Sequence, residues 1–254
     1  MRLIPPAYKL WRFEEQLRQL EIERLTGVDV AASKAASAIE ASLNQPALWN
    51  LRRLTFSREY CLGHGYSQSQ PTWQKVLENG DAEAARRKDP KYATHGIHPF
   101  KGKFYPQLAK ALLNISDVPV GGVVFDPFCG SGTVLLEGML NGFAAYGCDL
   151  NPLAAKMARA KTGIFTMPRQ VADLSMRSLL ERLSRPRLGT GREQFQEGTI
   201  DELQRWFPTP VLNKLNWLLG QVRLFGEPVL VLSLIHISEP TRRTPISYAV
   251  FCLK

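Results

Sequence analysis

The sequence contains no long apolar run. No stretch of its 254 residues approaches the ~18 consecutive apolar residues that a membrane-spanning helix needs. Residues 1–6, Met-Arg-Leu-Ile-Pro-Pro, also lack the apolar segment and the small-residue cleavage site of a secretory signal. We therefore expect a cytoplasmic protein that does not cross a membrane.

A disulfide framework and a metal-ligand cluster are missing as well. The thiols are scattered along the chain, which in a cytoplasmic protein predicts reduced cysteines: Cys61, Cys129, Cys148 and Cys252. Cys61-x-x-His64 and His95-x-x-His98 have the spacing of paired zinc ligands, but one cysteine with three histidines is an uncommon zinc set. We expect no metal site.

The sequence shows no internal repeat and no low-complexity tract. Hydrophobic residues make up 44% of the chain and charged residues 22%, a composition that excludes a disordered or collagen-like protein. The charge is unbalanced, because 32 lysines and arginines face 23 acidic residues and give a net charge of +9. This surplus favours a polyanionic partner such as nucleic acid, with a merely solvated basic surface as the alternative.

Residues 1–93 are predicted to form a helical extension that ends in a charged linker. Apolar residues at near-helical spacing, with Gly27 as a stop, predict a helix over residues 9–26: Leu10, Phe13, Leu17, Leu20 and Ile22. The Ala- and Ser-rich residues 31–43 predict a second helix. Residues 51–73 interleave basic and aromatic side chains, which suits a nucleic-acid surface or, as we favour, a loop held by buried aromatics.

From residue 94 onward the pattern indicates an α/β domain. A polar loop comes first, and then predicted helices alternate with short apolar strands: residues 107–115, 121–126, 134–141, 144–149 and 152–162. The order strand, helix, strand, helix is the beginning of a doubly wound parallel sheet.

The turn after the first of these strands has the features of a ligand cradle. The strand places Asp126 at its carboxyl end, and Gly130 and Gly132 allow a ligand to approach the backbone closely. The second strand ends in Asp149, which lies 19 residues after Gly130 and can accept hydrogen bonds from the ribose of an adenosine-containing cofactor. The glycine turn and the acid together therefore predict a cofactor site.

Two segments of this region resemble known motifs. Asp126-Pro-Phe-Cys-Gly-Ser-Gly-Thr, with Glu137 one helical turn later and Gly147-Cys-Asp-Leu-Asn-Pro behind it, looks like the cofactor motif of S-adenosylmethionine-dependent methyltransferases that act on exocyclic amino groups of bases. His98-Pro-Phe-Lys-Gly-Lys-Phe-Tyr-Pro-Gln-Leu resembles the motif just upstream in adenine-N6 and cytosine-N4 DNA methyltransferases. Together the two segments cover about 70 of the 254 residues.

The resemblance implies an incomplete Rossmann-like class I methyltransferase sheet over residues 94–231, with S-adenosyl-L-methionine as cofactor and DNA as substrate. Asp126 and the turn would contact the methionine part, Asp149 the ribose, and Leu150 or Asn151 the adenine. The implied cofactor-binding residues are Lys103, Phe104, Pro106, Asp126, Phe128, Cys129, Gly130, Ser131, Gly132, Thr133, Asp149, Leu150 and Asn151. A restriction endonuclease of the same system would be a further partner.

Two residues of the motif have a structural interpretation beside the functional one. Cys129 has no base near it in the sequence, so we interpret it as a small packing residue rather than a nucleophile. Glu137 lies one turn into its helix, where a bond to the glycine loop or support of the helix dipole is expected rather than catalysis.

For contacts to nucleic-acid phosphates we select Arg52, Arg53 and Lys101 from the basic residues. An RNA base N-methyltransferase is the alternative within the enzymes, since its glycine motif is much alike, although the Lys-Gly-Lys-Phe-Tyr-Pro string favours DNA. A nucleic-acid-binding module that keeps a methyltransferase scaffold without activity is the alternative from another class.

The catalytic motif that the resemblance implies is missing from the sequence. These families place a polar residue, two prolines and an aromatic at the tip of the fourth strand, to receive the target amine and stack the base. The only Pro-Pro of the chain is Pro5-Pro6, which lacks both neighbours. The catalytic residues are therefore unknown, and we expect the chain to be an inactive N-terminal part of such an enzyme.

The last residues offer an explanation for this absence. Residues 232–242 and 246–253 resemble, in order and in frame, the translation of a sequencing-library adapter, with an index sequence between them. We expect natural sequence to end near Val231 and residues 232–254 to be a non-native tail. The alternative is a genuine apolar strand over residues 229–237 followed by a turn.

Overall fold

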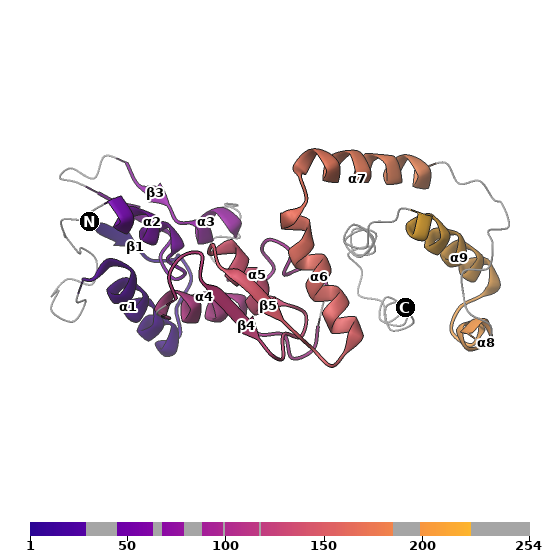
Figure 1. Ribbon diagram of the computed structural model, residues 1–254, viewed down its shortest axis with the longest axis horizontal. Helices are drawn as coiled ribbons and strands as arrows, with labels where there is room; N and C mark the ends of the chain where they lie inside the picture. The colour runs from indigo at the N-terminus through magenta and orange to yellow at the C-terminus, as the bar shows by residue number, and fades with distance from the viewer. Residues whose placement is uncertain are drawn as a thin grey trace. The chain divides into compact units, whose positions relative to one another are not determined.

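The computed structural model describes residues 1–28, 45–62, 68–78, 88–98, 100–116, 118–184 and 199–224 (Figure 1). The chain divides into two compact units, Met1–Thr162 and Gly163–Lys254. The predicted border at residue 93 does not separate compact units, because the extension packs against the helix that follows the polar loop. The predicted second helix at 31–43, the apolar run 229–237 and the tail 232–254 lie outside the described residues.

The extension contains a small antiparallel sheet as well as the predicted helices. Strands β1 (Arg2–Ile4), β2 (Glu59–Cys61) and β3 (Gln70–Pro71) pair in that order, with Leu3 opposite Tyr60. Each strand has at most three residues, which is too short for an alternating pattern to be visible in the sequence. The helices of the extension are α1 (Arg12–Thr26), α2 (Gln45–Arg53) and α3 (Trp73–Leu77).

Helix α1 ends before Gly27 as its sequence predicts, but it begins at Arg12 rather than at residue 9 and buries a different face. The Glu14 carboxylate accepts a 2.8 Å hydrogen bond from the Trp11 backbone N–H, and Gly27 ends the helix with a positive φ of 71°. The predicted apolar face is wrong in part, because Phe13 and Leu20 are about half exposed. The buried face instead carries two carboxylates among its residues: Glu14, Glu21, Ile22 and Leu25.

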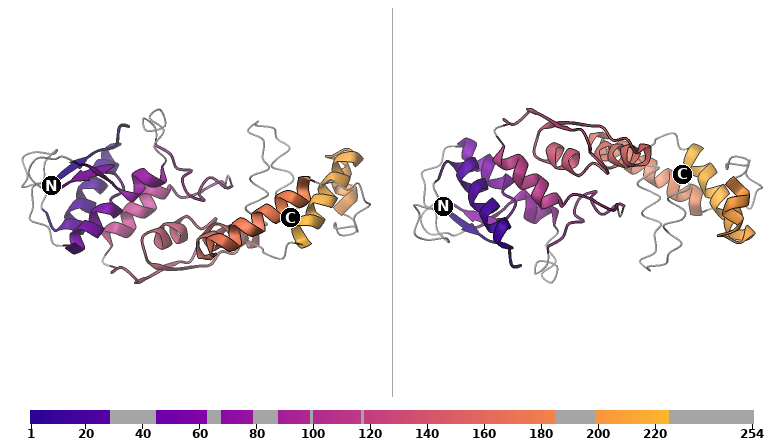
Figure 2. Two further views of the ribbon diagram at one scale, coloured as in Figure 1. Left: turned by 90° about the horizontal axis from the view of Figure 1, so that it is seen from above. Right: turned by 90° about the horizontal axis from the view of Figure 1, so that it is seen from below.

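Glu21 is held between the extension and helix α4 (Pro106–Ile115), which packs against α1 (Figure 2). Its Oε1 accepts hydrogen bonds from Thr55 Oγ1 at 2.5 Å and from Asn114 Nδ2 at 2.8 Å. Burial raises the pKa of the Glu21 carboxyl. These bonds hold the Glu21 side chain on the buried face of α1, beside Ile22 and Leu25, while Phe13 and Leu20 lie on the exposed side.

The buried face of α4 also carries polar side chains, beside Pro106, Ala109 and Ala111. Gln107 Nε2 donates to Glu78 Oε1 at 3.0 Å, and Lys110 Nζ donates to Gln74 Oε1 at 2.9 Å. Spacings of three and four residues place Gln107, Lys110 and Asn114 on one side of the helix. We call this cluster the polar seam: Glu21, Thr55, Gln74, Glu78, Gln107, Lys110 and Asn114.

The α/β part has the predicted order of elements. Strands β4 (Val123–Asp126) and β5 (Ala144–Gly147) pair in parallel, with Asp126 opposite Gly147, and α5 (Thr133–Leu140) connects them. Figure 1 shows α5 beside the two strands. Within the described residues this sheet has two strands, and its face away from α5 leaves Val123, Phe125 and Tyr146 each more than 60% exposed.

Helix α6 (Pro152–Thr166) crosses from the first unit into the second. The second unit continues with α7 (Arg169–Ser184), α8 (Thr199–Gln204) and α9 (Thr209–Leu224). Its small core is formed by Leu203, Phe207 and Leu212. Among the described residues, no helix combines the length and the apolar character that crossing a membrane requires.

Candidate cofactor site

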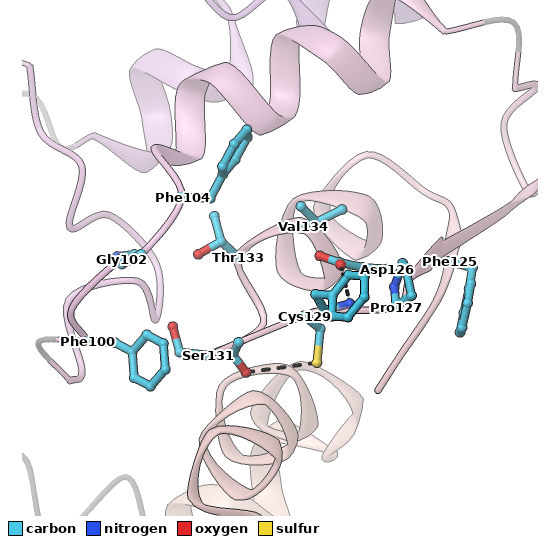
Figure 3. Close-up of a pocket in the computed structure, with 13 residues that line it drawn as sticks. Phe100, Gly102, Phe104, Phe125, Asp126, Pro127, Cys129, Ser131, Thr133 and Val134 are labelled. Carbon is cyan, nitrogen blue, oxygen red and sulfur yellow. Dashed lines mark hydrogen bonds between the residues drawn. The ribbon is translucent and has the colours of Figure 1, made fainter. Parts of the chain in front are cut away.

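A cavity of about 380 Å³ lies at the carboxyl end of β4, a volume within the usual range of ligand pockets. Its walls come from the loop before α4, from the turn after β4 and from the first turn of α5 (Figure 3). The lining residues are Phe100, Gly102, Lys103, Phe104, Phe125, Asp126, Pro127, Phe128, Cys129, Gly130, Ser131, Thr133 and Val134. Two segments that the sequence singled out separately therefore meet at one cavity.

The turn after β4 takes a path that favours glycine. Gly130 and Gly132 have φ values of 50° and 81°. A Cβ atom on Gly132 would also lie 2.9 Å from the Cα of Ala158 on α6. The turn is therefore pressed against α6, and α5 begins at once beyond Gly132, with Thr133 and Val134 at the cavity.

Two carboxylates hold this turn in shape. Asp126 Oδ1 accepts a 3.0 Å hydrogen bond from the Phe128 N–H. Asp149 Oδ2 accepts from the Gly130 N–H and its Oδ1 from the Asn151 N–H, both at 2.8 Å. Asp149 therefore connects the end of β5 to the glycine turn, and a contact to ribose stays a prediction.

The structure places the predicted cofactor residues in two groups. Those that line the cavity are Lys103, Phe104, Asp126, Phe128, Cys129, Gly130, Ser131 and Thr133. Gly132 is the buried residue before α5, and Pro106 is buried at the first position of α4. Asp149 lies behind the turn, Leu150 is fully exposed, and Asn151 Oδ1 accepts a 2.9 Å bond from the Leu153 N–H at the start of α6.

Glu137 supports the site from behind, but the predicted bond to the glycine loop is wrong. Its Oε1 lies 2.6 Å from Tyr92 Oη and 2.7 Å from His95 Nε2, and all three side chains are buried. Burial lowers the pKa of His95 and raises that of Tyr92. Glu137 thereby anchors the loop whose His95 carbonyl accepts a 2.6 Å bond from Lys103 Nζ.

Lys161 is a residue of the site that the sequence did not indicate. It lies on α6, only 1% exposed, and its Nζ donates to Ser131 Oγ at 3.0 Å. Burial, followed by the charge of Lys103, lowers the pKa of Lys161 to about 8. The sequence does not indicate that this lysine is buried, because its burial results from the packing of α6 on the turn.

Cys129 is buried at the packing position that the sequence suggested. It joins Leu135 and Ala158 in a small apolar cluster, and burial raises the pKa of its thiol. A raised pKa reduces the thiolate fraction at neutral pH, which disfavours a nucleophilic role. His64 of the first histidine and cysteine pair lies outside the described residues, and within them no three His, Cys, Asp or Glu side chains are grouped to hold a metal ion.

The three basic residues selected for phosphate contacts have different surroundings. Arg52 is exposed, and its Nε donates to Tyr60 Oη at 3.2 Å. Lys101 is exposed in the loop before α4. Arg53 contradicts the prediction, because it is only 4% exposed and its guanidinium lies 5.2 Å from the ring centroid of Phe143.

Comparison with known families identifies the segment that builds this cavity. The family model described as RMKL-like, methyltransferase domain matches residues 96–169, which include the loop before α4, the glycine turn, Asp149 and Lys161. This segment is similar to methyltransferase domains, and we expect it to use S-adenosylmethionine as they do.

Individual relatives come from two groups of methyltransferases. The chain is 36% identical over 91 residues to the type II methyltransferase M.MvaI of Kocuria varians, and 45% identical over 67 residues to the type II methyltransferase M.MjaII of Methanocaldococcus jannaschii. It is 40% identical over 76 residues to a tRNA (guanine(10)-N2)-dimethyltransferase of M. jannaschii. These matches cover 35%, 26% and 30% of the chain and 20%, 12% and 21% of the relatives.

Proposed function

We propose that the protein belongs to an enzyme that methylates an exocyclic amino group of a DNA base, adenine N6 or cytosine N4, with S-adenosylmethionine as methyl donor. The observation that carries this proposal is the meeting of the glycine turn and the Lys101–Pro106 string at one cavity. Residues 127–131 of the turn line the cavity, and its two glycines have the positive φ values that such a turn favours.

The residues present fit the cofactor. Lys103, Phe104 and the turn offer a cation, an aromatic ring and backbone groups for the methionine portion. We propose that Asp149, two residues after β5 and bonded to the glycine turn, contacts the adenosine portion. Bound cofactor supplies an activated methyl group, while the chain's own residues bind and orient it.

The choice of DNA over RNA rests on the string upstream of α4 and on the type II methyltransferases among the relatives. RNA is the second candidate, because the match to a tRNA methyltransferase is of similar identity. The net charge of +9 serves either nucleic acid. A restriction endonuclease would be a partner only in the DNA case.

Calorimetric titration of the 254-residue chain with S-adenosylmethionine tests the cofactor site. Asp149→Ala removes the acceptor of Gly130 and the predicted ribose contact, so affinity should fall by about 1.5–3 kcal/mol. Asp173→Ala on α7, an exposed carboxylate outside the site, is the matched control. Unchanged affinity in Asp149→Ala would contradict the assignment.

A methyl-transfer assay tests whether the chain by itself is inactive. Because the sequence lacks a polar-Pro-Pro-aromatic motif, we propose that the 254-residue chain binds the cofactor without transferring its methyl group. Radiolabelled methyl incorporation into unmethylated DNA and into tRNA should therefore be absent in both. Incorporation into DNA would contradict the proposed inactivity, and incorporation into tRNA would also contradict the choice of substrate.

A further inference from the structure

We propose that Lys161 and Ser131 form a carboxylate-binding pair in the cofactor cavity, in which the buried ammonium of Lys161 sets Ser131 to donate its hydroxyl hydrogen to the carboxylate of the cofactor's methionine portion. The inference rests on the proposed function and names which residues recognise one end of that cofactor.

The direction of the Lys161–Ser131 hydrogen bond fixes what Ser131 offers to a ligand. A lysine ammonium carries three donors and no acceptor, so Ser131 Oγ must accept the 3.0 Å bond from Lys161 Nζ. The hydroxyl hydrogen of Ser131 is then left to donate, and within the described residues it meets no acceptor. Since Ser131 lines the cavity, the acceptor that fits is an oxygen of the ligand (Figure 3).

The positive charge at this wall of the cavity favours an anionic ligand. Lys161 is 1% exposed and forms no ion pair with the acidic residues that the structure describes. Lys103 lines the same cavity, and its positive charge adds to that of Lys161. A buried ammonium without a counter-ion is costly, so a ligand carboxylate would offset part of that cost.

The position of the pair is fixed by its surroundings rather than by a flexible side chain. Thr94 Oγ1 donates to the Lys161 carbonyl at 3.0 Å, which joins α6 to the loop that carries His95. Gly132 contacts Ala158, one helical turn before Lys161. The glycine turn and Lys161 are therefore assembled by the same contact between the turn and α6.

The burial of Ser131 favours one of two possible sources of an anionic oxygen. A nucleic-acid phosphate would also suit a lysine and a serine hydroxyl. Ser131 is only 3% exposed, however, so the group that reaches it has to be small and to enter end-on. The carboxylate at the end of a methionine chain meets this requirement, whereas a backbone phosphate is flanked by two sugars.

Two ligands that differ in the amino acid portion test the assignment. S-Adenosylhomocysteine carries the carboxylate, and 5′-methylthioadenosine lacks it. Calorimetry on the 254-residue chain should show Lys161→Met and Ser131→Ala binding S-adenosylhomocysteine about tenfold or more weakly. Both variants should bind 5′-methylthioadenosine within about twofold of the unchanged chain, which also shows that their cavity is intact.

The exposed Lys156→Met on the same helix is the matched control and should change neither affinity. Equal losses for both ligands would overturn the pair as a carboxylate site, as would undiminished binding of S-adenosylhomocysteine. In either case the proposed function would stand. If the unchanged chain bound neither ligand, the proposed function would fail and this inference with it.

Discussion

At the polar seam the fully buried side chains include Glu21, Lys110 and Asn114, whereas the sheet of β4 and β5 exposes Val123 and Phe125. Residue type alone would predict the reverse. The seam is buried because its carboxylates, amides and ammonium bond one another across the helices, although Gln107 Oε1 and Asn114 Oδ1 have no partner among the described residues. The sheet face is exposed because no described segment packs on it. Burial in this molecule follows the available partners rather than the polarity of the residue.

The two regions also differ in what their polar groups do. In the seam, carboxylates and amides bond one another and fix α4 to the extension. At the cavity, Ser131 Oγ accepts from Lys161 and donates to no acceptor among the described residues, while the N–H groups of the turn are bonded within the protein: Phe128, Cys129, Gly130 and Gly132. The hydrogen bonds of the seam therefore join elements of the protein, whereas the hydroxyl hydrogen of Ser131 is available to a ligand.

The largest effect is expected from breaking the seam at Glu21. Glu21→Ala leaves the donors of Thr55 and Asn114 without their acceptor inside the protein, so the free energy of unfolding should fall by about 3 kcal/mol. Urea denaturation followed by circular dichroism measures it. Glu15→Ala, exposed on the same helix, should stay within about 0.5 kcal/mol, and similar losses in both variants would refute the special role of the seam.

The next effect concerns pH at the cavity. The pKa of Lys161 in the folded chain is about 8, below its ordinary 10.5, and Lys103 is the charged group that faces it. Affinity for S-adenosylhomocysteine should therefore be steady below pH 8 and fall by up to about tenfold per pH unit above it, as the ammonium loses its proton.

The pH dependence of stability has the opposite sign. Burial of the Lys161 ammonium costs free energy of folding below pH 8, and this cost fades as the pH rises from 8 toward 10.5.

Calorimetry between pH 6.5 and 9.5 measures the affinity for S-adenosylhomocysteine. Lys161→Met should flatten the profile, and a variant that kept the decline would assign it to another group.

A smaller effect on stability is expected when the charge of Lys110 is removed from the seam. Lys110→Met removes a fully buried ammonium and replaces it with an apolar chain of similar length. Because burial lowers the pKa of Lys110, removing the charge offsets the lost bond to Gln74, and stability should change by less than about 1.5 kcal/mol. A loss as large as that of Glu21→Ala would show that the seam needs the lysine charge.

The smallest effect is expected on the exposed sheet face. Val123→Thr keeps the β-branched shape on a residue that is 61% exposed, so stability should change by less than about 0.5 kcal/mol. Leu136→Ala on α5, whose side chain is fully buried, should cost about 2–5 kcal/mol in the same denaturation experiment. A Val123→Thr loss of comparable size would mean that this face is covered in solution.

The α/β order and most of the cavity wall could be predicted because they depend on local signals. Gly130, Gly132 and Asp126 mark a strand, a turn and a helix start within eight residues. The strands β1 to β3 and the buried carboxylates could not be predicted in this way. They depend on pairings such as Leu3 with Tyr60 and Glu21 with Asn114, which join distant parts of the chain.

The sequence by itself determined the cofactor turn, because glycine is required where φ is positive and an acid at a strand end needs no distant partner to be recognised. Only the tertiary structure decided that Arg53 is buried, that Glu137 anchors His95 and that Lys161 stands behind Ser131. The physical reason is that a charged side chain acquires its role from its burial and its partner, and packing across the chain sets both.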